Sequence, residues 1–155
     1  MGTRTFAGAT ISIATALPAT YDATGYAALT WKEHCVDAIP AINKAYNAVT
    51  KQTTCQTPDT DVKGGSKYDA VTYNFDPADN VDAEPLYQAA FDSQTAVVAI
   101  RLKFALRAGE TTPDTVYTAA QVAKFAVTNG GGKDDIDLKA VELWIQRELV
   151  KVEAA

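Results

Sequence analysis

Residues 95–109 read TAVVAIRLKFALRAG, and the alternation in this run decides the predicted fold class. A period of two is typical of a β-strand with one buried face, and here it places five apolar side chains together: Val98, Ile100, Leu102, Phe104 and Leu106. Three basic side chains share the opposite face: Arg101, Lys103 and Arg107. The run therefore predicts a long strand whose basic face either meets solvent or pairs with acidic groups of another subunit.

Shorter alternating runs predict further strands at 10–14, 29–36 and 70–76, with a turn-rich segment at 15–28. Residues 116–128 fit a helix or a strand, and Tyr117, Phe125 and Val127 favour the strand. The Asn-Gly-Gly-Gly sequence that begins at Asn129 predicts a turn. Residues 136–152 begin with alternation but also fit a helix, so the sequence leaves both open.

One helix is predicted at about residues 80–93, where acidic residues and Pro85 precede apolar residues at helical spacing. Residues 47–70 are polar and contain Pro58, Gly64 and Gly65, which predicts a long loop or a long flexible hairpin. Long loops in compact domains are often functional. The predicted fold is mainly β: a single domain over 1–155, built as an antiparallel sandwich or barrel-like subunit with one flanking helix.

The composition of the chain disfavours three classes of protein: nucleic-acid binding, membrane-spanning and exported. The 155 residues carry a net charge of −5, which disfavours binding of nucleic acid through its phosphates. No apolar run approaches the roughly 18 residues that cross a membrane. Residues 4–20 imitate a signal peptide, but Thr10, Ser12 and Thr15 interrupt the apolar stretch, so export is disfavoured.

No motif indicates catalysis or metal binding. His34 and Cys35 are adjacent, with Asp37 nearby, but neighbouring side chains on a strand point to opposite faces, so they read as ordinary strand residues. The GGGKDDID sequence at 130–137 faintly resembles one calcium-binding turn, yet a single copy reads better as a solvated hairpin. The Gly64-Gly65 pair lacks the Lys-Ser/Thr of a phosphate loop. We expect no enzymatic activity, no metal and no cofactor.

Four stretches together resemble the tail tube proteins of tailed bacteriophages: ISIATALPATYDATGYAALTW at 11–31, YNAVTKQTTCQTPDTDVKGG at 46–65, LYQAAFDS at 86–93 and AVVAIRLKFAL at 96–106. The resemblance implies a structural virion protein whose β-sandwich or barrel-like subunits form hexameric rings that stack into a hollow tube. DNA would pass through the lumen without specific binding. It also implies assembly in the host cytoplasm, residence in the virion tail and no membrane. The implied partners are further copies and other tail proteins: tape measure, terminator, baseplate or tip, and a sheath.

Subunit contacts are expected in the small-residue stretch at 14–28 and in the 47–70 segment, which could reach the next ring. Tyrosines are enriched at interfaces. The predicted contact residues are Tyr21, Asp22, Tyr26, Tyr46, Asn47, Thr50, Lys51, Lys63 and Lys67. An acidic lumen would repel DNA phosphates over about 8 Å at physiological salt.

Two further expectations stay open. Cys35 and Cys55 could form a disulfide within or between subunits, or remain free thiols. The alternative function is a monomeric β-sandwich binding module of the adhesin or carbohydrate-binding type. Such a module would present a platform of exposed aromatic side chains, whereas the aromatic residues here are spread along the predicted strands and helix.

Overall fold

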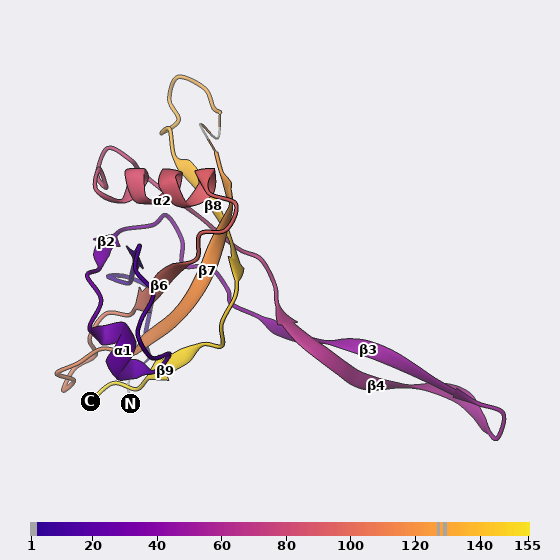
Figure 1. Cartoon of the computed structure of the whole chain (residues 1–155). Helices are drawn as coiled ribbons and strands as arrows, with labels where there is room; N and C mark the ends of the chain where they lie inside the picture. The colour runs from indigo at the N-terminus through magenta and orange to yellow at the C-terminus, as the bar shows by residue number, and fades with distance from the viewer. Residues whose placement is uncertain (1–2, 127, 129) are drawn as a thin grey trace.

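One antiparallel sheet forms the body of the protein (Figure 1), in a computed structural model that describes residues 3–126, 128 and 130–155. Its strand order is β2-β1-β6-β7-β8-β5, and β9 also pairs with β7. The strand bounds are β1 Thr10–Ala14, β2 Lys32–His34, β5 Val71–Phe75, β6 Val98–Lys103, β7 Thr115–Phe125, β8 Lys139–Ile145 and β9 Val150–Val152.

The main core lies on one face of this sheet, beneath helix α2 (Ala83–Asp92). Register brings the apolar positions together, since Ile11 lies opposite Leu102 and Ile13 opposite Ile100. Tyr87 of α2 is fully buried against this face. The alternation seen in the sequence therefore reflects a strand face packed beneath a helix.

A second, smaller core lies on the opposite face, beneath the five-residue helix α1 (Ala23–Ala27). Asp22 caps this helix, because its Oδ1 accepts a 2.7 Å hydrogen bond from the Gly25 backbone N–H. Thr20 packs so closely that a Cβ on Gly25 would lie 2.0 Å from the Thr20 carbonyl oxygen. Only glycine fits at that position. The sheet is thus covered on both faces over part of its area.

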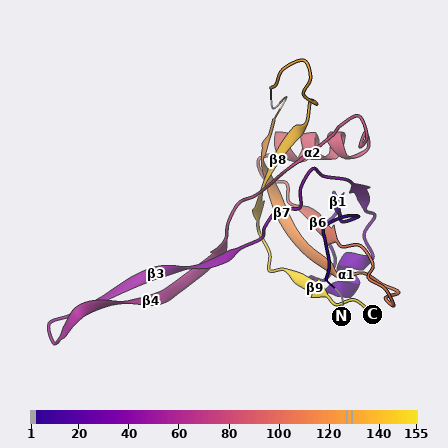
Figure 2. The same cartoon turned by 180° about the vertical axis from the view of Figure 1, so that it is seen from behind.

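Strands β3 (Lys44–Thr53) and β4 (Gln56–Tyr68) form a separate two-stranded hairpin that leads away from the body (Figures 1 and 2). The segment predicted as a long loop is therefore an ordered hairpin, the other form that its composition allowed. Its five threonines and two valines favour extended backbone.

The mainly β, antiparallel fold class is confirmed. The segment predicted at 116–128 contributes strand β7, which ends at Phe125, while Val127 and the turn predicted at Asn129 lie outside the described residues. Residues 136–152 contribute two strands, interrupted after Ile145. The predicted strand through Leu106 was too long: β6 ends at Lys103. Beyond it, the Glu110 N–H donates to the Arg107 carbonyl oxygen at 3.1 Å and closes a turn. The strand predicted over 29–36 is likewise reduced to the three residues of β2, and the helices number two among the described residues.

Candidate assembly surface

Most of the described residues of the β3–β4 hairpin are exposed. All ten residues of β3 are exposed, including Tyr46 at 55% and Val49 at 53%, and Val62 of β4 is 46% exposed. A two-stranded ribbon without a third strand or a covering helix is marginally stable in water. The hairpin therefore has the form of an element that gains stability from a partner.

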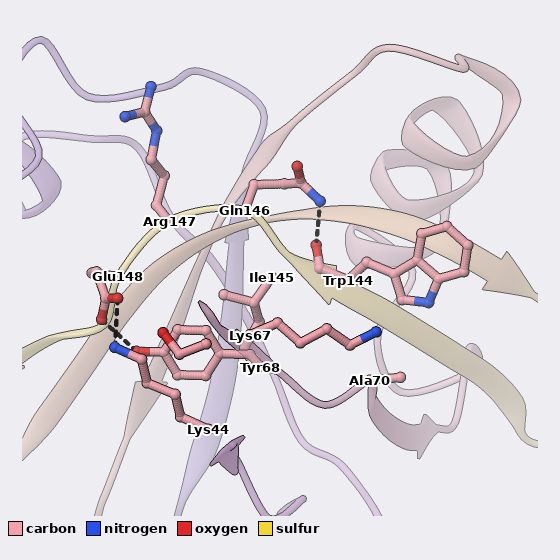
Figure 3. Close-up of a pocket in the computed structure, with 10 residues that line it drawn as sticks. Lys44, Lys67, Tyr68, Ala70, Trp144, Ile145, Gln146, Arg147 and Glu148 are labelled. Carbon is pink, nitrogen blue, oxygen red and sulfur yellow. Dashed lines mark hydrogen bonds and ion pairs between the residues drawn. The ribbon is translucent and has the colours of Figure 1, made fainter. Parts of the chain in front are cut away.

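Glu148 fastens the root of the hairpin to the body (Figure 3). Its Oε1 accepts a 2.7 Å hydrogen bond from the Lys44 ammonium, and its Oε2 accepts another at 2.7 Å from the Tyr68 hydroxyl. The hydrogen bond with Glu148 raises the pKa of Lys44, and the same bond lowers the pKa of Glu148. Nothing in the sequence pattern marked this contact, because 104 and 80 residues separate the partners.

A cleft of about 750 Å³ lies beside this root. Lys67 extends along the cleft toward Trp144, whose side chain is 54% exposed (Figure 3). The residues that line it are Lys44, Ser66, Lys67, Tyr68, Ala70, Trp144, Ile145, Gln146, Arg147 and Glu148. The cleft therefore lies between the root of the hairpin and the end of β8 at Trp144 and Ile145.

One face of the hairpin carries side chains that pair with each other. The Lys63 ammonium lies 4.7 Å from the centre of the Tyr46 ring. The Thr50 hydroxyl donates to Asp61 at 2.9 Å. A third cross-strand bond, from the Gln52 amide to Asp59 at 3.2 Å, lies nearer the tip. Three predicted contact residues, Tyr46, Thr50 and Lys63, therefore have partners inside the hairpin.

The opposite face, which we call the valine face, consists of Val49, Val62, Lys51 and Lys67. Val49 lies directly opposite Val62 in the strand register. A bulge in β4 brings Gly64 so close that a Cβ there would lie 2.8 Å from Cγ2 of Val49. Within the described part of the chain, the ammonium groups of Lys51 and Lys67 have no hydrogen-bond or ion-pair partner. The predicted contact residue Asn47 is exposed on the same side of β3.

The three predicted contact residues near α1 lie in different surroundings. Tyr21 is 39% exposed, and the Arg147 guanidinium stands 4.1 Å from its ring centre. Asp22 is the helix cap, and its hydrogen bond with Gly25 lowers the pKa of its carboxyl group. Tyr26 is fully buried, so we place it in the core of the folded chain, and its prediction as a contact residue is wrong.

The three basic side chains for which solvent exposure and pairing between subunits were both open have partners within the chain. Arg101 and Lys103 share Glu33, at 3.6 and 4.0 Å. Arg107 binds Glu110 at 2.9 Å and belongs to the turn after β6, not to the strand. Strand β1 pairs with both β2 and β6, which brings Glu33 beside the basic face. Pairing of these basic residues with another copy stays a prediction.

Both cysteines are free and exposed. Cys35 follows β2 on the body, whereas Cys55 lies in the turn at the hairpin tip, which leads away from the body (Figure 1). Of the alternatives left open for the two cysteines, the bridge within one chain is therefore not formed, and a bridge between chains stays a prediction.

His34 is a core residue with a buried hydrogen bond. Its Nε2 lies 2.8 Å from the Tyr87 hydroxyl, which also contacts the Tyr73 hydroxyl. Burial lowers the pKa of His34 to about 4, so the ring is neutral at pH 7. Across the described ranges, no group of three or more His, Cys, Asp or Glu side chains could hold a metal ion. None of the described helices is long and apolar enough to cross a membrane.

Comparison with known proteins adds a likeness of fold. No family model matches the chain, and no curated protein matches it. Among solved structures, the fold is similar to that of a chain in the cryo-EM structure of the anti-feeding prophage (AFP) baseplate, 6-fold symmetrised. The TM-score is 0.69 at 7% sequence identity, over 99% of this chain and 98% of that chain. At this identity the likeness concerns the fold, which the two chains share over nearly their whole length.

Proposed function

We propose that this chain is a structural subunit of a phage-tail-like particle, which self-associates into hexameric rings that stack into a hollow tube. The exposed β3–β4 hairpin is the observation that carries the proposal, because a lone ribbon of this kind calls for a partner surface. The fold shared with a chain of the anti-feeding prophage baseplate supports a structural role in a tail or baseplate. Rotational symmetry would use one surface of each copy against a different surface of the next.

The proposed particle is a virion tail or tail-like assembly, with further partners among tail and baseplate proteins. Subunits would assemble in the host cytoplasm and carry no catalytic activity. DNA would pass through the lumen without specific binding, and the net charge of −5 suits a lumen that repels phosphates.

The alternative of a monomeric binding module is less well supported. Exposed aromatic side chains among the described residues lie on separate elements and do not form one platform: Phe6, Tyr21, Tyr46, Phe91 and Trp144. A platform for carbohydrate would gather such rings on one surface.

Electron microscopy and light scattering of the purified chain test the proposal over a range of concentrations. We expect rings or tubes with sixfold symmetry from the wild type. A variant in which a two-residue turn replaces residues 46–66 should remain folded by circular dichroism but stay monomeric, because it lacks the proposed contact element. A wild-type chain that remains a monomer at the highest concentration contradicts the proposal and favours the binding module.

A further inference from the structure

The valine face presents an apolar pair between two lysines without partners. Val49 and Val62 are 53% and 46% exposed, and Lys51 and Lys67 carry the nearby positive charge. Such a face fits a partner surface that combines exposed apolar groups with carboxylates, since complementary charges set register and orientation at interfaces. Over residues 44–68 the hairpin has four lysines against two aspartates.

A surface of this kind is present on α2 and the loop before it. Between Lys67 and Arg101 the sequence contains six acidic residues and no lysine or arginine. Five of these acids belong to α2 and the loop before it, and we call them the acidic surface: Asp76, Asp79, Asp82, Glu84 and Asp92. Two apolar side chains are exposed among them, Val81 at 67% and Phe91 at 41%.

The acids at the start of α2 are available for a partner. Asp82 occupies the N-cap position without making a cap hydrogen bond. Within the described residues the Asp79 carboxylate also has no hydrogen-bond or ion-pair partner. Of the five, Glu84 alone has an ion pair in the described part of the chain, with Lys139 at 4.0 Å.

The two surfaces of one copy do not meet, because the hairpin leads away from α2 (Figures 1 and 2). We propose that the valine face of one copy docks on the acidic surface of a second copy. This pairing rests on the proposed function and names the partner of the hairpin. Each copy has one surface of each kind, so the contact is heterologous and can be repeated from copy to copy.

Charge reversal tests the pairing in the full-length chain. The double variants Lys51→Glu/Lys67→Glu and Asp79→Lys/Asp82→Lys each replace attraction by repulsion. We expect each to raise the critical concentration for assembly about tenfold or more. Combining all four changes in one chain should restore assembly to within about threefold of wild type. Lys151→Glu is the matched control, because this exposed lysine of β9 lies outside both surfaces and its reversal should leave assembly unchanged.

A second measurement needs no variant. A zero-length carbodiimide reagent joins amines and carboxylates that are in contact, and mass spectrometry of assemblies mixed from ¹⁴N and ¹⁵N chains identifies links between copies. We expect links from Lys51 or Lys67 of one copy to residues 76–92 of another. Treatment with nuclease beforehand removes nucleic acid, and loss of assembly on treatment would assign the lysines to a nucleic acid instead and overturn the pairing.

The outcomes separate the two proposals. If the wild type assembles but the charge reversals leave its critical concentration unchanged, or the combined variant is no better than the double variants, the pairing is wrong and the proposed function stands. If Lys51 and Lys67 are linked only to segments outside residues 76–92, the pairing is likewise wrong and the proposed function stands. A wild-type chain that stays monomeric contradicts the proposed function, and the pairing with it.

Discussion

Tyr26 stacks on Tyr117, with ring centres 5.3 Å apart and ring planes inclined by only 8°. The stack fixes the short helix α1 to strand β7, and the Trp31 indole N–H adds a 3.0 Å hydrogen bond to the Tyr26 carbonyl oxygen. A helix of five residues is too short to persist alone. This tertiary contact therefore holds the helix in place.

Replacing Tyr26 by alanine should destabilise the folded chain by about 3–5 kcal/mol, because it empties a large buried site. Tyr21→Ala is the matched change at an exposed ring in the same segment, and we expect a cost within about 1 kcal/mol. Urea unfolding followed by circular dichroism measures both. Equal losses from the two variants would contradict the burial of Tyr26.

Stability should decline as the pH falls from 6.5 toward 4, because of His34. Burial lowers the pKa of this ring to about 4, so between these values the unfolded chain binds a proton that the folded chain does not. The stabilisation is fully present above pH 6.5, and up to about 3 kcal/mol of it is lost as the pH falls to 4.

The measurement compares urea unfolding of wild type and His34→Gln at pH 7.5, 5.5 and 4.5. Glutamine keeps a polar group near the Tyr87 hydroxyl but does not titrate. Its free energy of unfolding should change less than that of the wild type over this range. Parallel curves for the two proteins would exclude His34 as the cause.

Asp114 joins the two ends of the described chain. Its carboxylate binds the guanidinium of Arg4, that of Arg107 at 2.9 Å, and the backbone N–H of Ala154 at 2.7 Å. The hydrogen bond from Ala154 is the main reason that the pKa of this carboxyl is lowered.

Asp114→Ala should speed trypsin cleavage after Arg107 roughly tenfold, because local opening of the chain around Arg107 becomes easier. Glu153→Ala, a neighbouring exposed acid, should leave the rate unchanged, and equal rates in both variants would refute this role.

Glu148 should control the mobility of the hairpin with little effect on the body. Glu148→Ala removes the acceptor shared by Lys44 and Tyr68. Hydrogen exchange measured by mass spectrometry should become faster near both residues, while the thermal midpoint stays within about 2 °C, because exposed ion pairs contribute little to global stability. Unchanged exchange at the hairpin root would show that its position does not depend on Glu148.

The body of the fold was predictable because its strands have one buried face. Ile11 and Ile13, or Val98 and Ile100, repeat at a spacing of two since alternate side chains enter the core. The helix at about 80–93 was predicted for the same reason, with Tyr87 on its buried side. The hairpin has no buried face, so its strands show no alternation of apolar and polar residues, and its order could not be read from the sequence.

The residues of the candidate assembly surface could be predicted only in part from the sequence. Tyr21 and Tyr26 are alike in the sequence, and their different burial depends on Tyr117, which is distant along the chain. Likewise, Arg101 of β6 forms its ion pair with Glu33 of β2 only because β1 lies between these two strands. Lys51 and Lys67 were among the predicted contact residues, but which lysines have partners depends on the register of β3 with β4 and on the bulge near Gly64.

The contact at Glu148 also has a mechanical consequence. Glu148 belongs to the connection between β8 and β9, and both of these strands pair with β7 in the middle of the sheet. A force applied at the hairpin tip therefore reaches the central sheet through Lys44, Tyr68 and Glu148, as well as along the backbone at the root. A pull on the hairpin would therefore be transmitted to the central sheet at Glu148.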